Sequence, residues 1–177
     1  METTPADAAL LAAIGEGDTA ALHALYERYG GPLFGFLYRL AGDRGTAEEI
    51  LQDTLLAVWR SAHSFQGRSS PSTWLFGVAR RQAHNRLRLM PPPVPAEPYE
   101  LADPEPGPEE AAVGAERVQR ALRRLPLQQR EVLALSVLED LSHQEIAEIL
   151  AIPVGTVKSR LHHARATLRG CLDERVS

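Results

Sequence analysis

The side chains most clearly spaced for a binding role lie within residues 141–169. From Pro153 to Arg169 this stretch carries four basic residues and no acidic one, which suits a helix lying against phosphate groups. Its polar side chains fall on a different face from its apolar ones. They are Thr156, Lys158, Ser159, Arg160, His163 and Arg165. The pattern predicts a surface that binds nucleic acid.

Two short, closely connected helices are expected to position these side chains. Ser142 and Glu145 have the spacing of a capping box, which starts the first helix. Pro153 suits the first position of the second helix, where its missing N–H costs nothing. Val157, Leu161, Ala164 and Leu168 then form the core-facing side of that helix. The pair predicts a DNA-binding helix-turn-helix, favoured over an ordinary αα-hairpin with a solvated basic face.

The amino-acid composition excludes several other classes of protein. The chain has 177 residues, 44% of them apolar, and a single cysteine, so a core is expected and an internal disulfide framework is excluded. No paired His/Cys spacing suggests zinc, and no cofactor is expected. The acidic N-terminus and the lack of a long apolar run predict a cytoplasmic protein without membrane insertion of its own. Because no carboxylate or cysteine constellation joins His143, His162 and His163, we do not expect an enzyme.

The net charge of −4 is unevenly distributed along the chain. Residues 91–112 hold six acidic residues, eight prolines and no basic residue, and this composition is typical of an extended, self-repelling linker. In polyproline-like conformation the linker would reach roughly 60 to 70 Å. The sequence therefore predicts an all-α protein of two small helical domains, 1–90 and 113–177, joined by a flexible acidic proline-rich linker.

Charged residues are unevenly distributed within the first domain as well. Residues 54–90 contain six arginines and no acidic residue, interleaved with aromatic side chains. Aromatic rings and nearby cations are what single-stranded nucleic acid requires, for its bases and its backbone. Trp74 has an alternative role as part of a helical core, which we favour for it. On the last helix of this domain, Arg80, His84 and Arg88 repeat every four residues and form one basic stripe.

Local signals place three helices in this domain. Asp18 is expected to cap the first, Thr46 and Glu49 to form a capping box that opens a second over 47–62, and Ser70 to start a third that ends near 89. The middle helix has more apolar residues than one buried face can use. Gln52, Leu56 and Trp59 form a second stripe, which indicates a partner protein unless Trp59 folds back over its own domain.

Taken together, these segments resemble a bacterial RNA polymerase sigma factor of the extracytoplasmic function group. The resemblance covers nearly the whole chain. The matching segments are AEEILQDTLLAVW (47–59), SFQGRSSPSTWLFGVARRQAHNRLR (64–88), LRRLPLQQREVLAL (122–135) and the helix-turn-helix (141–169). A helix-turn-helix alone occurs in many regulators, whereas both blocks in this order across an acidic linker are strong evidence for this family.

The resemblance implies a role for each group of residues. A polymerase-binding surface for the clamp helices of the largest subunit comprises Glu49, Gln52, Asp53, Leu56 and Trp59. A loop and the helix behind it would bind the melted minus-10 strand. Their residues are Phe65, Gln66, Gly67, Arg68, Ser69, Trp74, Arg80, Arg81, His84 and Arg88. The major groove of the minus-35 element would receive Thr156, Lys158, Ser159, Arg160, His163 and Arg165.

The same resemblance implies the partners. They are core RNA polymerase, through its clamp helices and flap, promoter DNA, and an anti-sigma factor that covers these surfaces. The acidic linker would thread through polymerase channels that otherwise hold RNA. The alternative function is a helix-turn-helix regulator that acts without binding the polymerase core.

One residue departs from the family pattern. Ala151 stands in the turn of the helix-turn-helix, where the family usually has glycine. If this position has a positive φ, alanine costs about 1 kcal/mol there.

Overall fold

The computed structural model describes residues 5–90, 109–138 and 141–173, and these residues form helices and connecting turns without a strand. The all-α prediction is confirmed. The helices, in chain order, are α1 (Pro5–Gly15), α2 (Thr19–Ala41), α3 (Arg44–Ser61), the short 3-10 helix η1 (Ala62–Ser64), α4 (Pro71–Leu89), α5 (Glu109–Arg123), α6 (Leu127–Ser136), α7 (His143–Leu150) and α8 (Val154–Asp173).

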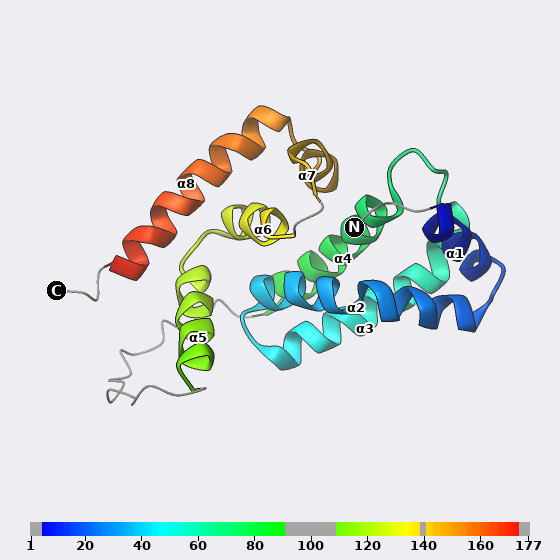
Figure 1. The fold of residues 1–177 in the computed structure, drawn as a ribbon, viewed down its shortest axis with the longest axis horizontal. Coiled ribbons are helices and arrows are strands. Elements are labelled where there is room, and N and C mark those ends of the chain that lie inside the picture. Colours follow the sequence, from blue (N-terminus) through cyan, green and yellow to red (C-terminus); the bar gives the residue numbers. More distant parts are fainter. Residues whose placement is uncertain (1–4, 91–108, 139–140, 174–177) are drawn as a thin grey trace.

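The N-terminal helical group, α1 to α4, is built around α2 (Figure 1). α2 packs against α1, α3 and α4, and most of its apolar side is buried. Phe36 of α2 meets Phe76 of α4 edge to face, with ring centroids 5.6 Å apart. Such a pair stabilises beyond its buried area, and it fixes the position of α4 relative to α2.

Side-chain caps start these helices. Asp18 accepts hydrogen bonds from Ala20 N (2.8 Å) and Ala21 N (3.2 Å), and Ser70 accepts one from Thr73 N (3.1 Å), as expected for both residues. The predicted Thr46–Glu49 capping box is wrong. α3 begins three residues earlier, because Asp43 is its N-cap and accepts from Thr46 N at 2.8 Å.

A buried carboxylate joins α1 to α2. Asp7 is fully buried; it forms an ion pair with Arg28 (2.7 Å) and accepts a hydrogen bond from the Tyr29 hydroxyl (2.8 Å). Burial, and secondarily the bond to Asp7, raises the pKa of the Tyr29 phenol well above its usual value. Tyr29 therefore remains a neutral hydrogen-bond donor, and α1 is held on α2.

The C-terminal helical group, α5 to α8, has its own buried residues, including Val132, Leu135, Ile146, Val157 and Leu161. α8 packs against α5, α6 and α7. Residues 109–112, the end of the predicted linker, belong to α5. The remainder of that linker, 91–108, lies outside the described residues.

The two helical groups pack against each other. α6 lies against α2, and α7 lies against α4, while α8 occupies the side of the C-terminal group away from α4 (Figure 1). No helix in the described part of the chain is long and apolar enough to cross a membrane.

Candidate nucleic-acid interface

The connection between α7 and α8 has the geometry of a tight helix-turn-helix. Ser142 and Glu145 form the predicted capping box, with Glu145 N donating to Ser142 Oγ (3.2 Å) and Ser142 N donating to Glu145 Oε2 (2.9 Å). At the other end of α7, Ala151 adopts the left-handed conformation (φ 53°, ψ 46°). Ile152 N then donates to Ala147 O at 3.0 Å, as in a Schellman motif. The condition for strain at Ala151, a positive φ, is therefore met.

α8 begins at Val154, so Pro153 lies just before the helix rather than at its first position. The Pro153 carbonyl accepts from Thr156 N (2.9 Å) and Val157 N (3.1 Å), which closes the first turn. Val157, Leu161 and Ala164 are buried, as their spacing predicts. This burial fixes which face of α8 points outward.

The residues assigned to the minus-35 element lie on α8 and remain accessible. Lys158, Ser159, His163 and Arg165 are exposed, while Thr156 and Arg160 are half-buried. The Ser159 hydroxyl donates to Thr156 O within the helix (3.1 Å), which leaves its oxygen able to accept. A helix with this arrangement can present donors to base edges and phosphates together.

The loop between η1 and α4 is braced by an aromatic pair. Phe65 packs against Trp74 edge to face, with centroids 5.7 Å apart, and both rings are half-buried against the core. Gln66, Gly67 and Arg68 are exposed, and Ser69 is half-buried. Gly67 has a positive φ of 68°, which turns the loop outward. The packing of Trp74 favours a supporting role over base stacking.

An open hollow of about 480 Å³ lies between this loop and α1. It is lined by Phe65 and Gly67 of the loop, by His63 of η1, and by Ala8 and Glu16 at the α1 side, among others. The residues from α1 were not expected at this place. The small side chains of Ala8, Ala12 and Gly15 are consistent with a hollow, but their spacing did not indicate one.

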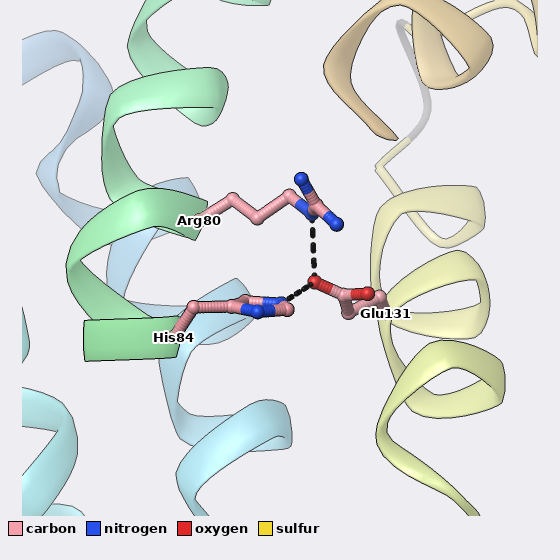
Figure 2. A network of polar contacts seen from close by, with 3 residues as sticks. All are labelled: Arg80, His84 and Glu131. Carbon is pink, nitrogen blue, oxygen red and sulfur yellow. Dashed lines mark hydrogen bonds and ion pairs between the residues drawn. The ribbon is translucent and has the colours of Figure 1, made fainter. Parts of the chain in front are cut away.

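The predicted basic stripe of α4 is divided. Arg81 and Arg88 are exposed, but Arg80 and His84 contact Glu131 of α6 (Figure 2). Arg80 Nε donates to Glu131 Oε1 at 2.8 Å, and His84 Nε2 lies 2.5 Å from the same oxygen. Glu131 itself is fully buried. Nothing in the spacing of these residues indicated this contact.

The second stripe of α3 is partly exposed to solvent. Glu49 and Gln52 are exposed, although Glu49 forms an ion pair with Arg86 of α4. Leu56 is 52% exposed, whereas Asp53 and Trp59 are half-buried. Trp59 packs against the core. Leu56 is thus the most accessible apolar residue of the stripe.

In the described residues no group of three or more His, Cys, Asp or Glu side chains could hold a metal ion. The candidate interfaces contain hydrogen-bond donors, cations and apolar side chains, which suit recognition of another macromolecule.

The chain matches two family models in order along its length. Residues 25–89 match the model described as Sigma-70 region 2, and residues 115–168 match Sigma-70, region 4. The first covers α2 to α4 for the most part, and the second covers the helix-turn-helix and the helices before it.

Curated relatives extend the match to most of the chain. The ECF RNA polymerase sigma factor RpoE of Cereibacter sphaeroides is 34% identical over 156 residues, covering 86% of each chain. The ECF RNA polymerase sigma factor SigW of Bacillus subtilis is 32% identical over 170 residues, covering 87% of this chain and 90% of its own.

Solved structures have the same fold. The structure of CnrH in complex with the cytosolic domain of CnrY superimposes with a TM-score of 0.75, at 25% identity, covering 96% of this chain and 99% of that one. The sigma factor RpoE of Bartonella quintana, solved with the anti-sigma factor NepR, gives a TM-score of 0.65 at 24% identity, covering 85% and 97%.

These matches define a transcription initiation factor of the sigma-70 class. The chain belongs to the ECF RNA polymerase sigma factors. It acts by binding core RNA polymerase and directing transcription initiation from specific promoters.

Proposed function

We propose that the two helical groups hold the promoter at two separate points while the protein is bound to core polymerase. Residues 1–90 bind polymerase and the melted minus-10 strand, 91–112 connect, and 113–177 bind the minus-35 duplex. The observation that carries this proposal is the match of region 2 and region 4 to the two helical groups, in that order.

The polymerase contact is assigned to α3. Leu56 supplies exposed apolar area, and Trp59 borders it from a half-buried position. Glu49, Gln52 and Asp53 supply polar contacts at the edge of the same stripe. Large apolar side chains at a patch centre with a polar rim are typical of protein interfaces. The clamp helices of the largest subunit are the partner that the family resemblance implies.

The minus-10 contact is assigned to the loop of residues 62–71 and to α4. Gln66 and Arg68 are free to contact a base or a phosphate, and the Phe65–Trp74 pair holds the loop in place. Arg81 and Arg88 add cations for the strand backbone. Arg80 and His84 belong to the same surface once their contact with Glu131 is broken.

The minus-35 contact is assigned to α8. Its first turns enter the major groove with Thr156, Lys158, Ser159 and Arg160, and His163 and Arg165 follow along the helix. Base-edge contacts provide specificity there, while contacts to phosphates provide affinity that weakens with salt.

Melting follows from differential binding. The N-terminal group binds an opened strand better than duplex, so the polymerase-bound protein shifts the population toward open promoter. Unstacking of a captured base is offset by the fitted loop and the basic surface. The chain itself performs no covalent chemistry, and it works in the cytoplasm beside the polymerase.

The same proposal includes a partner protein that inhibits this chain. The structure of the Bartonella quintana relative contains an anti-sigma factor. We infer that an anti-sigma factor also covers the polymerase- and DNA-binding surfaces of this chain. Co-purification of the native protein from resting cells tests it, and recovery of the chain without any such partner contradicts it.

In vitro transcription with purified core polymerase and a promoter library tests the main proposal. Specific initiation that depends on the added chain is expected, together with a complex on gel filtration. Active core that neither binds the chain nor initiates specifically with it would refute the proposal. A helix-turn-helix regulator would instead bind promoter DNA without polymerase.

A further inference from the structure

A buried carboxylate lies between the two helical groups, on the surface assigned to DNA. Glu131 of α6 is fully buried, and its Oε1 atom is contacted by both Arg80 and His84 of α4. Figure 2 shows both α4 side chains pointing across the gap between the helices toward this carboxylate. A carboxylate and a DNA phosphate are anionic acceptors that compete for the same guanidinium.

A second set of polar contacts joins the groups at the C-terminal end of α2. The carbonyl groups of the last turn of a helix lack partners within the helix and carry partial negative charge. Here carbonyl groups of the last turn and of the C-cap Gly42 accept hydrogen bonds from side chains of the C-terminal group: Gln119 Nε2 to Tyr38 O (2.5 Å), Arg130 Nη1 to Leu40 O (2.6 Å), and Arg123 Nη2 to Gly42 O. Tyr38 O also accepts from Gly42 N at 2.9 Å.

Gly42 makes room for one of these contacts. A Cβ atom at this position would lie 2.6 Å from Arg123 Nε, and the residue has a positive φ of 87°. Glycine meets both demands, because it accepts the left-handed backbone and adds no side chain.

The contact between the groups is specific but incomplete. Among the described atoms, Glu131 Oε2 is buried without a hydrogen-bond partner. A hollow of about 290 Å³ lies next to His84, and Arg88 and Leu127 also line it, among others. Burial, and secondarily the nearby Arg123, lowers the pKa of the Arg130 guanidinium. These features weaken the polar part of the contact, which adjoins a continuous cluster of buried apolar residues from both groups.

We propose that this is an autoinhibited closed form, in which Glu131 occupies Arg80 and His84 and thereby excludes the DNA backbone from α4. The inference rests on the assignment of Arg80 and His84 to the minus-10 strand. Binding of the opened strand and docking of α6 on α4 exclude each other. Release of the C-terminal group exposes the α4 cations and frees α8 to reach a separate site.

The first measurement is the distance between the groups in the free protein. Spin labels on native Cys171 of α8 and on Ala24→Cys, an exposed position of α2, report this distance by pulsed electron resonance. Glu131→Gln removes the charge at nearly constant shape, and Glu116→Gln is the control at an exposed glutamate of α5. For the wild type and the control we expect a short, narrow main population with a minor longer one. For Glu131→Gln we expect the longer, broader population to dominate.

Arg123→Met is a second variant, which breaks the contact at Gly42 without altering Glu131. It keeps the test open if Glu131→Gln does not fold, as judged by circular dichroism. It should lengthen the distance in the same way. Unchanged distributions in the folded variants would overturn the proposal.

The second measurement is the affinity of the free protein for a single-stranded oligonucleotide carrying the melted minus-10 element. If about four fifths of the free protein is closed, complete opening tightens apparent binding about fivefold, since only the open fraction binds. Glu131→Gln and Arg123→Met should both show this gain, and Glu116→Gln should not. Opening without any gain in affinity would show that the contact is not inhibitory. A wild-type protein that fails to initiate transcription would instead refute the proposed function, because the distances are measured without polymerase.

Discussion

Ala151 holds a backbone conformation that alanine adopts at a cost. Its φ of 53° ends α7 in the left-handed region, and the resulting hydrogen bonds close the turn before α8. The resemblance to sigma factors singled out this position in the sequence, and the structure gives the physical reason. The turn is retained because burial of Ile149, Val157 and Leu161 fixes the two helices around it.

Replacing Ala151 by glycine should stabilise the protein. We expect Ala151→Gly to raise the free energy of unfolding by about 1 kcal/mol, since glycine is not strained at positive φ. Ala166→Gly, at an exposed position of α8 with ordinary helical geometry, is the control and should lower it by about 1 kcal/mol. Chemical denaturation measures both. A loss of similar size at both positions would show that Ala151 is unstrained.

Arg160 tests whether α8 recognises bases. It is half-buried on the face that carries Thr156 and His163. If Arg160 contacts a base edge, Arg160→Ala should weaken binding to the preferred minus-35 element by about 1 to 3 kcal/mol and relax the preference at one position. Competition binding across sequence variants measures this. An equal loss on every sequence would assign Arg160 to a phosphate instead.

At the scale of single helices, capping residues in the sequence predicted where some helices begin but not where α3 begins. Asp18, Ser70 and Ser142 were predictable because capping depends on residues a few positions apart. The start of α3 was not, since Asp43 and Thr46 are both good caps, and in the structure Asp43 caps α3 directly after Gly42 ends α2. The buried role of Asp7 was also missed. An acidic residue near a chain end gives no local sign that Arg28 and Tyr29 will enclose it.

The exposed side of α3 predicts the effect of one truncation. Leu56→Ala should lower affinity for core polymerase by about 1 to 2 kcal/mol, the expected value for apolar area lost from an interface. Because Leu56 is half exposed, the free energy of unfolding should change by no more than about 0.5 kcal/mol. Leu89→Ala, which is 80% exposed on α4 outside the assigned surface, is the control. Equal affinities for Leu56→Ala and the wild type would remove α3 from the polymerase interface.

At the scale of the whole molecule, the sequence predicted two groups of helices but not how they meet. The acid-free stretch of 54–90 and the acidic linker composition separated the groups. Their contact joins Arg80 to Glu131, residues 51 positions apart with no shared periodicity. The α4 cations lie on the polar face of the predicted helix, so the sequence assigned them only to DNA. The structure adds a second acceptor for them within the same chain.

The closed arrangement and promoter binding are two states of one surface. In the closed state α6 and α7 cover part of α2 and α4, while the assigned faces of α3 and α8 stay accessible. Polymerase can thus engage α3 first, and separation of the groups then uncovers the remaining cations of α4. Such an order confines binding of the opened strand to the polymerase-bound protein.

Site-specific crosslinking in the open promoter complex is the most direct test that the two helical groups bind the promoter at two separate points. A photoreactive phenylalanine analogue is placed at position 66 in the loop or at position 163 on α8, both exposed. We predict that position 66 labels the non-template strand of the melted minus-10 element and that position 163 labels duplex DNA at the minus-35 element. Labelling of one and the same element from both positions, or of duplex alone from position 66, would contradict the account.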